Sequence, residues 1–188
     1  MRKIQAAILL CMTVLGLTAC GTGSQNAQGP EEVTFRTDVS VEDLKAAVVE
    51  ELGENYWPNM ALNETDIEGL LGVSAQDYEE AVAEMPMIST NVDTLIIIRA
   101  KEGKTVDVEK AVTEYRERLV NDTMQYPMNI GKIQASEVAV YGNYVCFVQL
   151  GADTMKAAEQ GDEAVITHCK EANAKALDAI FTKLTTNP

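Results

Sequence analysis

The sequence predicts an α+β domain with a small three-stranded, mostly antiparallel sheet, N-terminal helices, a strand-helix-hairpin core and a C-terminal helix. The first strand is predicted over residues 92–100, where four consecutive apolar residues, Leu95 to Ile98, fit a sheet that is covered on both faces. The other two strands, residues 137–141 and 144–150, flank Gly142-Asn143, a two-residue connection of the kind that β-hairpins use. A right-handed crossover then places residues 144–150 in the middle of the three strands.

Three segments before the first strand share a helix-start pattern. Each has an apolar residue, a capping residue and an acid three positions after the cap, and the capping residues are Ser40, Asn63 and Ser74. The three helices that this pattern predicts end at Gly53, near Gly72 and before Pro86.

Two further helical regions are predicted after the first strand. Asp107 is expected to cap a helix that Pro127 limits and whose apolar stripe is Val108, Val112, Tyr115 and Leu119. The chain after Gly151 is predicted to be helical to its end, with an interruption at Gly161. Its apolar stripe contains one polar residue, Asn173, which must find a hydrogen bond or an edge position.

The N-terminus resembles the signal peptide of bacterial lipoproteins. Arg2 and Lys3 precede an apolar stretch, residues 4–17, which is shorter than the roughly 20 residues that cross a bilayer. The stretch ends on Leu17-Thr18-Ala19-Cys20, which resembles a lipobox. In lipoproteins the cysteine sulfur receives a diacylglyceryl group and the chain is cut before it. The resemblance therefore implies that Cys20 is the lipidated first residue of the mature protein.

Three regions follow from this interpretation: a signal peptide at residues 1–19, the lipidated cysteine with a flexible linker at residues 20–32, and a single globular domain at residues 33–188. The linker is rich in Gly, Ser, Asn and Gln, and twelve such residues span roughly 20 Å. We therefore expect a protein held to the cell membrane, on its extracellular face, through the lipid on Cys20.

The chain is strongly acidic, with 29 Asp and Glu residues against 15 Lys and Arg residues. Its formal charge of −14 becomes −16 once Arg2 and Lys3 leave with the signal. Such a polyanion is repelled by phosphate backbones and anionic lipids, so we expect no nucleic acid partner. Because no calcium-loop motif is present, most acids are interpreted as solvated helix faces.

No catalytic residue, metal or cofactor is predicted. His168 is the only histidine, and Cys169 beside it on a helix points about 100° away, so the two cannot form a dyad. No zinc-ligand motif is present, and methionine is commoner as a core residue than as a copper(I) ligand.

Tyr56 and Trp57 are the only candidates for ligand contact. They follow the first predicted helix in Tyr56-Trp57-Pro58, which contains the only tryptophan. A stacking platform for a sugar is one interpretation of this pair, and packing over the end of the helix is the interpretation that we favour.

Several segments between about residues 55 and 150 resemble segments of one protein family. They are Glu84-Met85-Pro86-Met87, the strand at residues 92–101, Tyr126-Pro127, and Tyr141-Gly142-Asn143-Tyr144-Val145. Together they resemble a family of uncharacterised lipoproteins from clostridia and related Gram-positive gut bacteria. That family is a domain of unknown function, so the resemblance implies a cellular context but no activity and no catalytic residues.

We therefore expect a non-enzymatic lipoprotein that binds an envelope protein or ligand outside the membrane. The alternative is an envelope hydrolase with paired carboxylates, which a cleft with two converging acids of raised pKa would favour. A third hypothesis is a small-ligand-binding lipoprotein with its site around Tyr56 and Trp57.

Cys146 and Cys169 are predicted to be two buried, reduced thiols. Cys146 shares a sheet face with Tyr144 and Val148, while Cys169 lies on the apolar stripe of the terminal helix. A helix axis about 10 Å from a sheet leaves the two Cα atoms about 7 to 8 Å apart, beyond the reach of about 4.4 to 6.8 Å that disulfides have.

Overall fold

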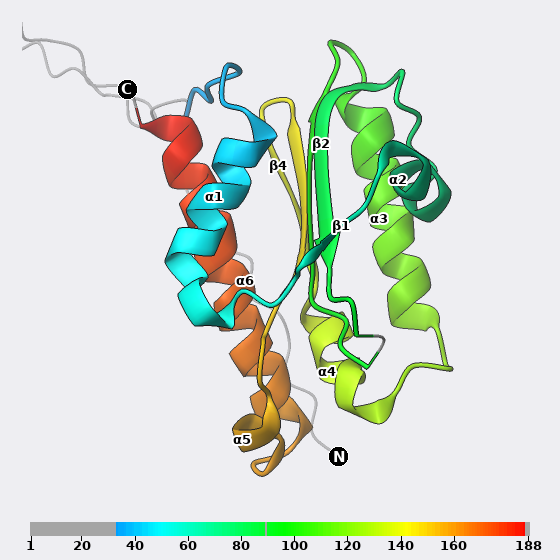
Figure 1. Ribbon diagram of the computed structural model, residues 1–188, viewed down its shortest axis with the longest axis vertical. Helices are drawn as coiled ribbons and strands as arrows, with labels where there is room; N and C mark the ends of the chain where they lie inside the picture. The colour runs from blue at the N-terminus through cyan, green and yellow to red at the C-terminus, as the bar shows by residue number, and fades with distance from the viewer. Residues whose placement is uncertain (1–32, 89, 187–188) are drawn as a thin grey trace, which may run out of the picture. The chain divides into compact units, whose positions relative to one another are not determined.

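The computed structural model describes residues 33–88 and 90–186 (Figure 1). In these residues the helices are α1 (Val41–Leu52), the 3-10 helix η1 (Gly53–Asn55), α2 (Glu64–Leu71), α3 (Thr105–Asn121), α4 (Pro127–Ala135), α5 (Met155–Ala158) and α6 (Asp162–Thr185). The strands are β1 (Met60–Ala61), β2 (Tyr78–Met85), β3 (Thr94–Ala100), β4 (Glu137–Tyr141) and β5 (Tyr144–Gln149). They form one antiparallel sheet in the order β1-β2-β3-β5-β4.

The sheet lies between two layers of helices (Figure 1). Helices α1 and α6 pack on the face that carries Leu95 and Ile97, and helices α2 and α3 pack on the face that carries Ile96 and Ile98. All four side chains are completely buried. The prediction that this strand is covered on both faces is therefore confirmed, and the resulting two cores account for its unbroken apolar run.

The predicted three-stranded sheet is wrong, because the described residues form a five-stranded sheet. The two additional strands, β1 and β2, lie beyond β3, so the α+β class holds but β3 becomes the middle strand. Within the part that was predicted, β5 does lie between β3 and β4.

The largest error concerns β2, which the sequence predicted as a helix beginning after Ser74. Ser74 starts a turn instead, and its carbonyl accepts a hydrogen bond from the Asp77 amide. The register of β2 against β3 shifts between Tyr78 and Glu80, so Tyr78 and Ala81 contact the same core although they are three positions apart. Tyr78 and Val82, whose spacing fits one face of a helix, belong to the two opposite cores, and the pairing of β2 with β3 decides the structure.

Most other local predictions are confirmed. Ser40 caps α1, Asn63 forms a capping box with Asp66 at the start of α2, and Gly142-Asn143 joins the β4–β5 hairpin. Helix α3 begins at Thr105, so Asp107 lies in its first turn and is not the cap. Helix α4 was not predicted; Pro127 is its first residue, a position where the missing N–H costs nothing.

The C-terminal region consists of two helices separated at Gly161, whose φ of 106° favours glycine. Asn173 is completely buried on α6, where it accepts a hydrogen bond from the Leu150 amide and donates one to the Ala135 carbonyl. The expected hydrogen bond is therefore present, and it ties α6 to the ends of β5 and α4. No helix in the described part of the chain is long and apolar enough to span a bilayer.

Candidate binding cleft

Several loops meet at one end of the sheet. They are residues 56–59, 86–88 with 90–93, 122–126 and 150–154, and Figure 1 shows this end next to α4 and α5. The described chain begins at the opposite end, where the Arg36 amide donates a hydrogen bond to the Leu184 carbonyl. Loops clustered at one end of a rigid sheet are where binding residues are most often found.

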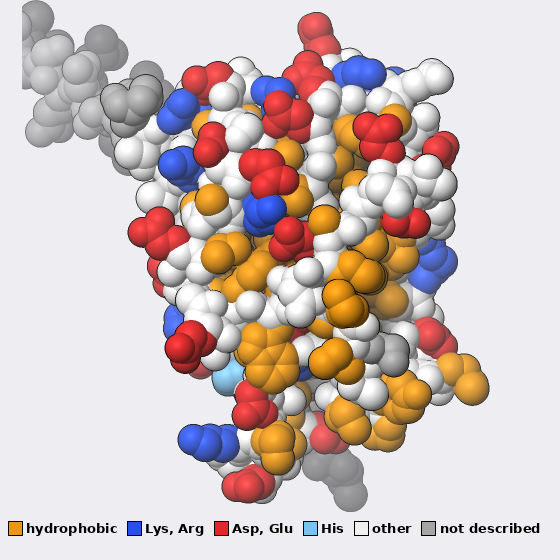
Figure 2. Space-filling model, viewed as in Figure 1, with side chains coloured by type: hydrophobic (Ala, Val, Ile, Leu, Met, Phe, Trp, Pro, Cys, Tyr) orange, Lys and Arg blue, Asp and Glu red, His pale blue; other side chains and the backbone are white. Residues whose placement is uncertain are grey.

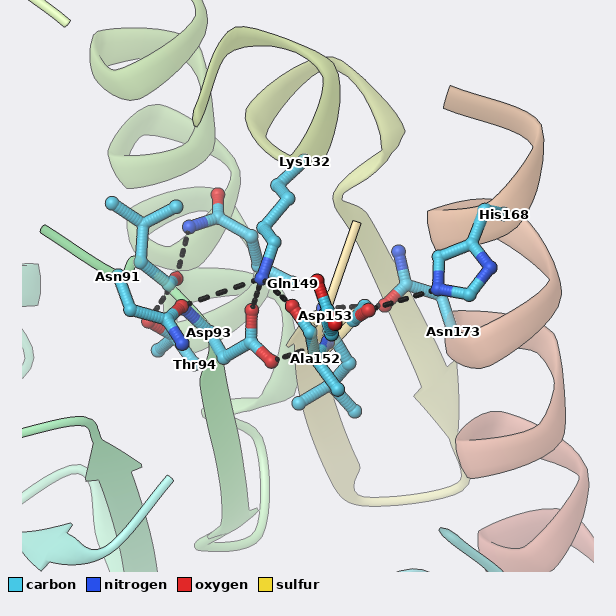
Figure 3. Close-up of polar contacts among 12 residues, drawn as sticks. Asn91, Asp93, Thr94, Lys132, Gln149, Ala152, Asp153, His168 and Asn173 are labelled. Carbon is cyan, nitrogen blue, oxygen red and sulfur yellow. Dashed lines mark hydrogen bonds and ion pairs between the residues drawn. The ribbon is translucent and has the colours of Figure 1, made fainter. Parts of the chain in front are cut away.

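A buried ion pair holds these loops together. Lys132, on α4, is 4% exposed, and its ammonium contacts the Asp93 carboxylate, which is completely buried just before β3. The Lys132 ammonium also donates to the Asn91 side chain at 3.4 Å and to the Ala152 carbonyl at 2.7 Å (Figure 3). Burial raises the pKa of the Asp93 carboxyl above its ordinary value, and the ammonium of Lys132 opposes this rise.

The same pair fixes the loop after β5. The other carboxylate oxygen of Asp93 accepts a hydrogen bond of 2.8 Å from the Ala152 amide (Figure 3). Ala152 has a φ of 45°, a left-handed conformation that is unusual for a residue with a side chain. Its N–H and C=O are thus held by opposite charges, which compensates for the local strain.

An uncharged cleft of about 320 Å³ lies beside the ion pair. Its apolar wall comes from six residues, Leu70, Met85, Pro86, Val92, Leu119 and Ile133. The polar residues that line it are Asn91, Thr94, Tyr115, Gln125 and Gln149. The described lining contains no Asp, Glu, Lys, Arg or His side chain, so the cleft is suited to an uncharged occupant.

Gln149 is a buried polar residue in the wall of this cleft. The residue is 2% exposed, and its Nε2 donates a hydrogen bond of 2.5 Å to the Val92 carbonyl. Its Oε1 is buried and has no hydrogen-bond partner among the described residues. Figure 3 shows the amide with only its nitrogen engaged. A buried acceptor without a partner costs stability, so its presence requires an explanation.

Large exposed apolar side chains surround the mouth of the cleft. Met87 (74% exposed) and Ile88 (66%) follow the lining residue Pro86, while Met124 (87%) and Tyr126 (57%) flank the lining residue Gln125. Further exposed residues at this end of the chain's fold are Trp57, Met60, Met128, Ile130 and Met155. Figure 2 shows apolar side chains gathered over the lower half of this view. We call Met87, Ile88, Met124 and Tyr126 the cleft rim.

Tyr56 and Trp57 each contact a charged side chain of the domain. The Tyr56 hydroxyl donates a hydrogen bond of 2.7 Å to Glu84, and burial raises the pKa of that phenol. Trp57 is 41% exposed, and its ring lies over the Lys132 ammonium, 5.6 Å from the nitrogen to the ring centroid. Neither residue is among those that line this cleft, and a role for the pair in ligand contact stays a prediction.

His168, Cys146 and Cys169, which the sequence analysis considered for catalysis, lie elsewhere in the domain and do not line the cleft. One ring nitrogen of His168 makes a hydrogen bond of 2.9 Å with the Gly151 carbonyl. Cys146 and Cys169 are both buried free thiols, which confirms that prediction. Among the described residues, no group of three or more His, Cys, Asp or Glu side chains is arranged to hold a metal ion. Cys20 lies outside the described residues.

Sequence reasoning missed the residues that build this end. Asp93 was not singled out, although its position directly before four consecutive apolar residues was a signal of burial. Lys132 lies between Ile130 and Ile133 in a helix that was not predicted, so no pattern indicated that it faces inward. Gln149 is the last residue of a strand that is buried throughout. A polar residue at the end of an apolar strand was the one sequence signal that could have pointed to this site.

The fold and the cleft define a three-layer α+β domain with an uncharged pocket at the loop end of its sheet. The chain belongs to the family described as Domain of unknown function (DUF4358), whose profile matches residues 51–150. That range contains every residue that lines the cleft. No curated protein and no solved structure matches the chain.

Proposed function

We propose that this protein is a lipid-anchored, non-enzymatic binding module outside the cell membrane, and that its cleft receives an uncharged group from an exported partner. The observation that carries this proposal is the uncharged cleft together with its exposed apolar rim. Apolar side chains that lie exposed together mark interaction sites more often than scattered ones do.

The methionines of the rim support a role in binding. Met87 and Met124 are the two most exposed large apolar side chains around the cleft. Methionine is flexible and polarizable, and exposed methionines occur on surfaces that adapt to partners of different shape. A structural role gives no reason to leave them in water.

The cleft and the first described residues lie at opposite ends of the folded domain. The described chain begins beside Leu184, whereas the cleft lies towards the start of α6, near the packing of Gly131 on Val165. Nineteen residues of helix separate Val165 from Leu184, a length of about 28 Å.

The anchor itself is tested by Cys20→Ser, because only the thiol accepts the diacylglyceryl group in lipoproteins. We expect the wild-type chain to lose its signal and gain the mass of the lipid, whereas the variant keeps its signal uncut and carries no acyl chain. Acyl chains on the variant would show that the lipobox interpretation is wrong.

Capture of a small molecule is a second candidate function. A volume of about 320 Å³ is at the lower end of the range for ligand pockets. The hydrolase alternative gains no support from this cleft, since its described lining contains no carboxylate. Asp93, the buried acid nearby, forms an ion pair with Lys132 and accepts a hydrogen bond from the Ala152 amide.

A photo-crosslinking residue in place of Met124 tests the binding proposal in living cells. The matched control is the same residue in place of Val106, which is 73% exposed on the first turn of α3 at the opposite end. We expect a specific adduct with an exported protein or envelope component from position 124 only. Equal adducts at both positions, or none at either, would contradict a binding site at this end.

A further inference from the structure

Strand β4 forms one outer edge of the sheet, and its outward side has no partner strand in the described chain. It pairs with β5 on the other side, with Tyr141 opposite Tyr144 next to the two-residue turn. Residues beside such a turn bond to each other, so the backbone N–H and C=O of Val138 and Val140 point away from β5. None of the described residues makes a hydrogen bond to these four groups.

The opposite edge of the sheet is protected against pairing with another strand. Strand β1 has only two residues, and the Leu62 amide donates a hydrogen bond to the Ala83 carbonyl beside it. The rest of β2 is irregular, because its register shifts between Tyr78 and Glu80. In contrast, β4 has five residues in continuous register, contains no proline or lysine, and has one charged residue, Glu137, at its start. An edge without such protection is a template for a further strand.

The sequence of β4 is complementary to a second copy of itself. Two copies placed antiparallel, with their Ala139 residues opposite each other, bring Val138 of one copy opposite Val140 of the other. Each free N–H then meets a free C=O, so the interchain hydrogen bonds use all the free groups of both strands. Glu137 lies opposite Tyr141 of the other copy, so no like charges are paired along the two strands.

Both cores of the domain would continue across this junction. Val138 and Val140 pack against the core on the α3 side, whereas Ala139 and Tyr141 pack against the core on the α6 side. All four residues are only half-buried, and the same residues of a second copy would cover them further. We propose that the protein forms a two-fold symmetric dimer, in which the β4 strands pair antiparallel about Ala139 and join the two sheets into one. The cleft lining contains no residue of β4, so this inference does not depend on the cleft.

The charge of the chain gives the dimer a dependence on salt. Each copy has a formal charge of −14, so two copies repel each other at long range. Raising the ionic strength from about 0.01 M to about 0.15 M shortens the screening length from about 30 Å to about 8 Å. The hydrogen bonds between the strands are uncharged. We therefore expect the dimerisation constant of the full chain, measured by sedimentation, to rise over this range.

A mixture of two cysteine variants of the full chain tests the register. Val138→Cys in one copy and Val140→Cys in the other would lie directly opposite, with Cα atoms about 5.5 Å apart, which a disulfide can span. Two copies of the same variant would hold their new cysteines diagonally, about 7 to 8 Å apart, which is too far. On mild oxidation we expect a disulfide-linked dimer from the mixture and its loss when either variant is alone. The unsubstituted chain is the blank for the native cysteines.

A pair of proline variants tests the hydrogen bonds. Val140→Pro removes the outward N–H of each copy, and so half of the interchain bonds, while the bonds to β5 remain. Ala81→Pro is the matched control, because residue 81 alternates with Ala83, whose carbonyl faces β1, and so turns its N–H towards the opposite edge of the sheet. The dimerisation constant should fall at least about tenfold with Val140→Pro and stay unchanged with Ala81→Pro.

Three results would overturn the inference. The first is a chain that stays monomeric at every concentration and ionic strength, and the second is a disulfide-linked dimer that forms as readily from one cysteine variant as from the mixture. The third is an equal effect of the two proline variants on dimerisation. If Val140→Pro does not fold, the cysteine mixture decides the matter. A specific adduct at position 124 of a monomeric chain would contradict the dimer and leave the binding proposal standing.

Discussion

The buried pair of Asp93 and Lys132 gives the sharpest prediction about stability. Removing one partner leaves the other charge buried without compensation, which costs about 3–5 kcal/mol of unfolding free energy. Lys132→Met and Asp93→Asn each retain the approximate shape of the side chain. We expect each single variant to lose this amount, and the double variant to lose about 2–3 kcal/mol less than the sum of the two.

The dependence on pH distinguishes the two single variants. The folded-state pKa of Asp93 is raised, so its contribution to stability is fully present below the unfolded-state pKa and is lost as the pH rises through the folded-state value. Removing Lys132 takes away the opposing charge and raises that pKa further. The cost of Lys132→Met should therefore be larger at pH 7.5 than at pH 5, while the cost of Asp93→Asn should not increase with pH.

Urea unfolding followed by the fluorescence of Trp57 measures these free energies, since its ring lies over Lys132. Lys110→Met is the matched control, because Lys110 forms an exposed pair with Glu114 at 3.9 Å and its loss should cost less than about 1 kcal/mol. A pH-independent cost for Lys132→Met, or strict additivity of the two substitutions, would refute the reasoning.

Two further predictions concern the residues around the loop after β5. Gly151→Ala should destabilise the fold by about 1–3 kcal/mol, because the new methyl carbon would lie 2.5 Å from the Cys169 sulfur. Urea unfolding should show a smaller cost when Cys169→Ala is already present, and an equal cost in both backgrounds would contradict the contact. Burial raises the pKa of the Cys146 thiol to about 12 and that of Cys169 to about 11. At pH 8 the folded chain should resist alkylation at both thiols, and denaturant without reductant should expose both; peptide mapping that finds either one labelled in the native chain would be inconsistent with this burial.

Local sequence patterns predicted a helix or strand correctly where the pattern fits only one of the two. Ser40 and Asn63 precede true helices, and the apolar run from Leu95 to Ile98 identifies a strand between two cores. The same start pattern failed at Ser74, because the segment after it pairs with β3 as a strand in which Tyr78 and Val82 face opposite cores. Long-range pairing of this kind leaves no unambiguous local trace.

The residues of the candidate site could not be predicted from the sequence, because tertiary packing brings them together. Asp93, Lys132 and Gln149 come from three elements that are far apart in the sequence, and each is an ordinary polar residue when viewed alone. Their burial became visible only when α4 was placed against the ends of β3 and β5. In contrast, the thiols of Cys146 and Cys169 were predicted correctly, since strand alternation and the helical stripe are local properties.

The most direct test of the account is to narrow the cleft and measure the adduct formed at position 124. Leu119→Trp places a larger side chain at a lining position, whereas Val120→Trp adds the same ring to a neighbouring residue that is 41% exposed and outside the cleft lining. If the cleft receives a group from the partner, the yield of the adduct should fall at least several-fold with Leu119→Trp and remain at the wild-type level with Val120→Trp. Equal yields in both variants would contradict the central claim that this cleft is a binding site.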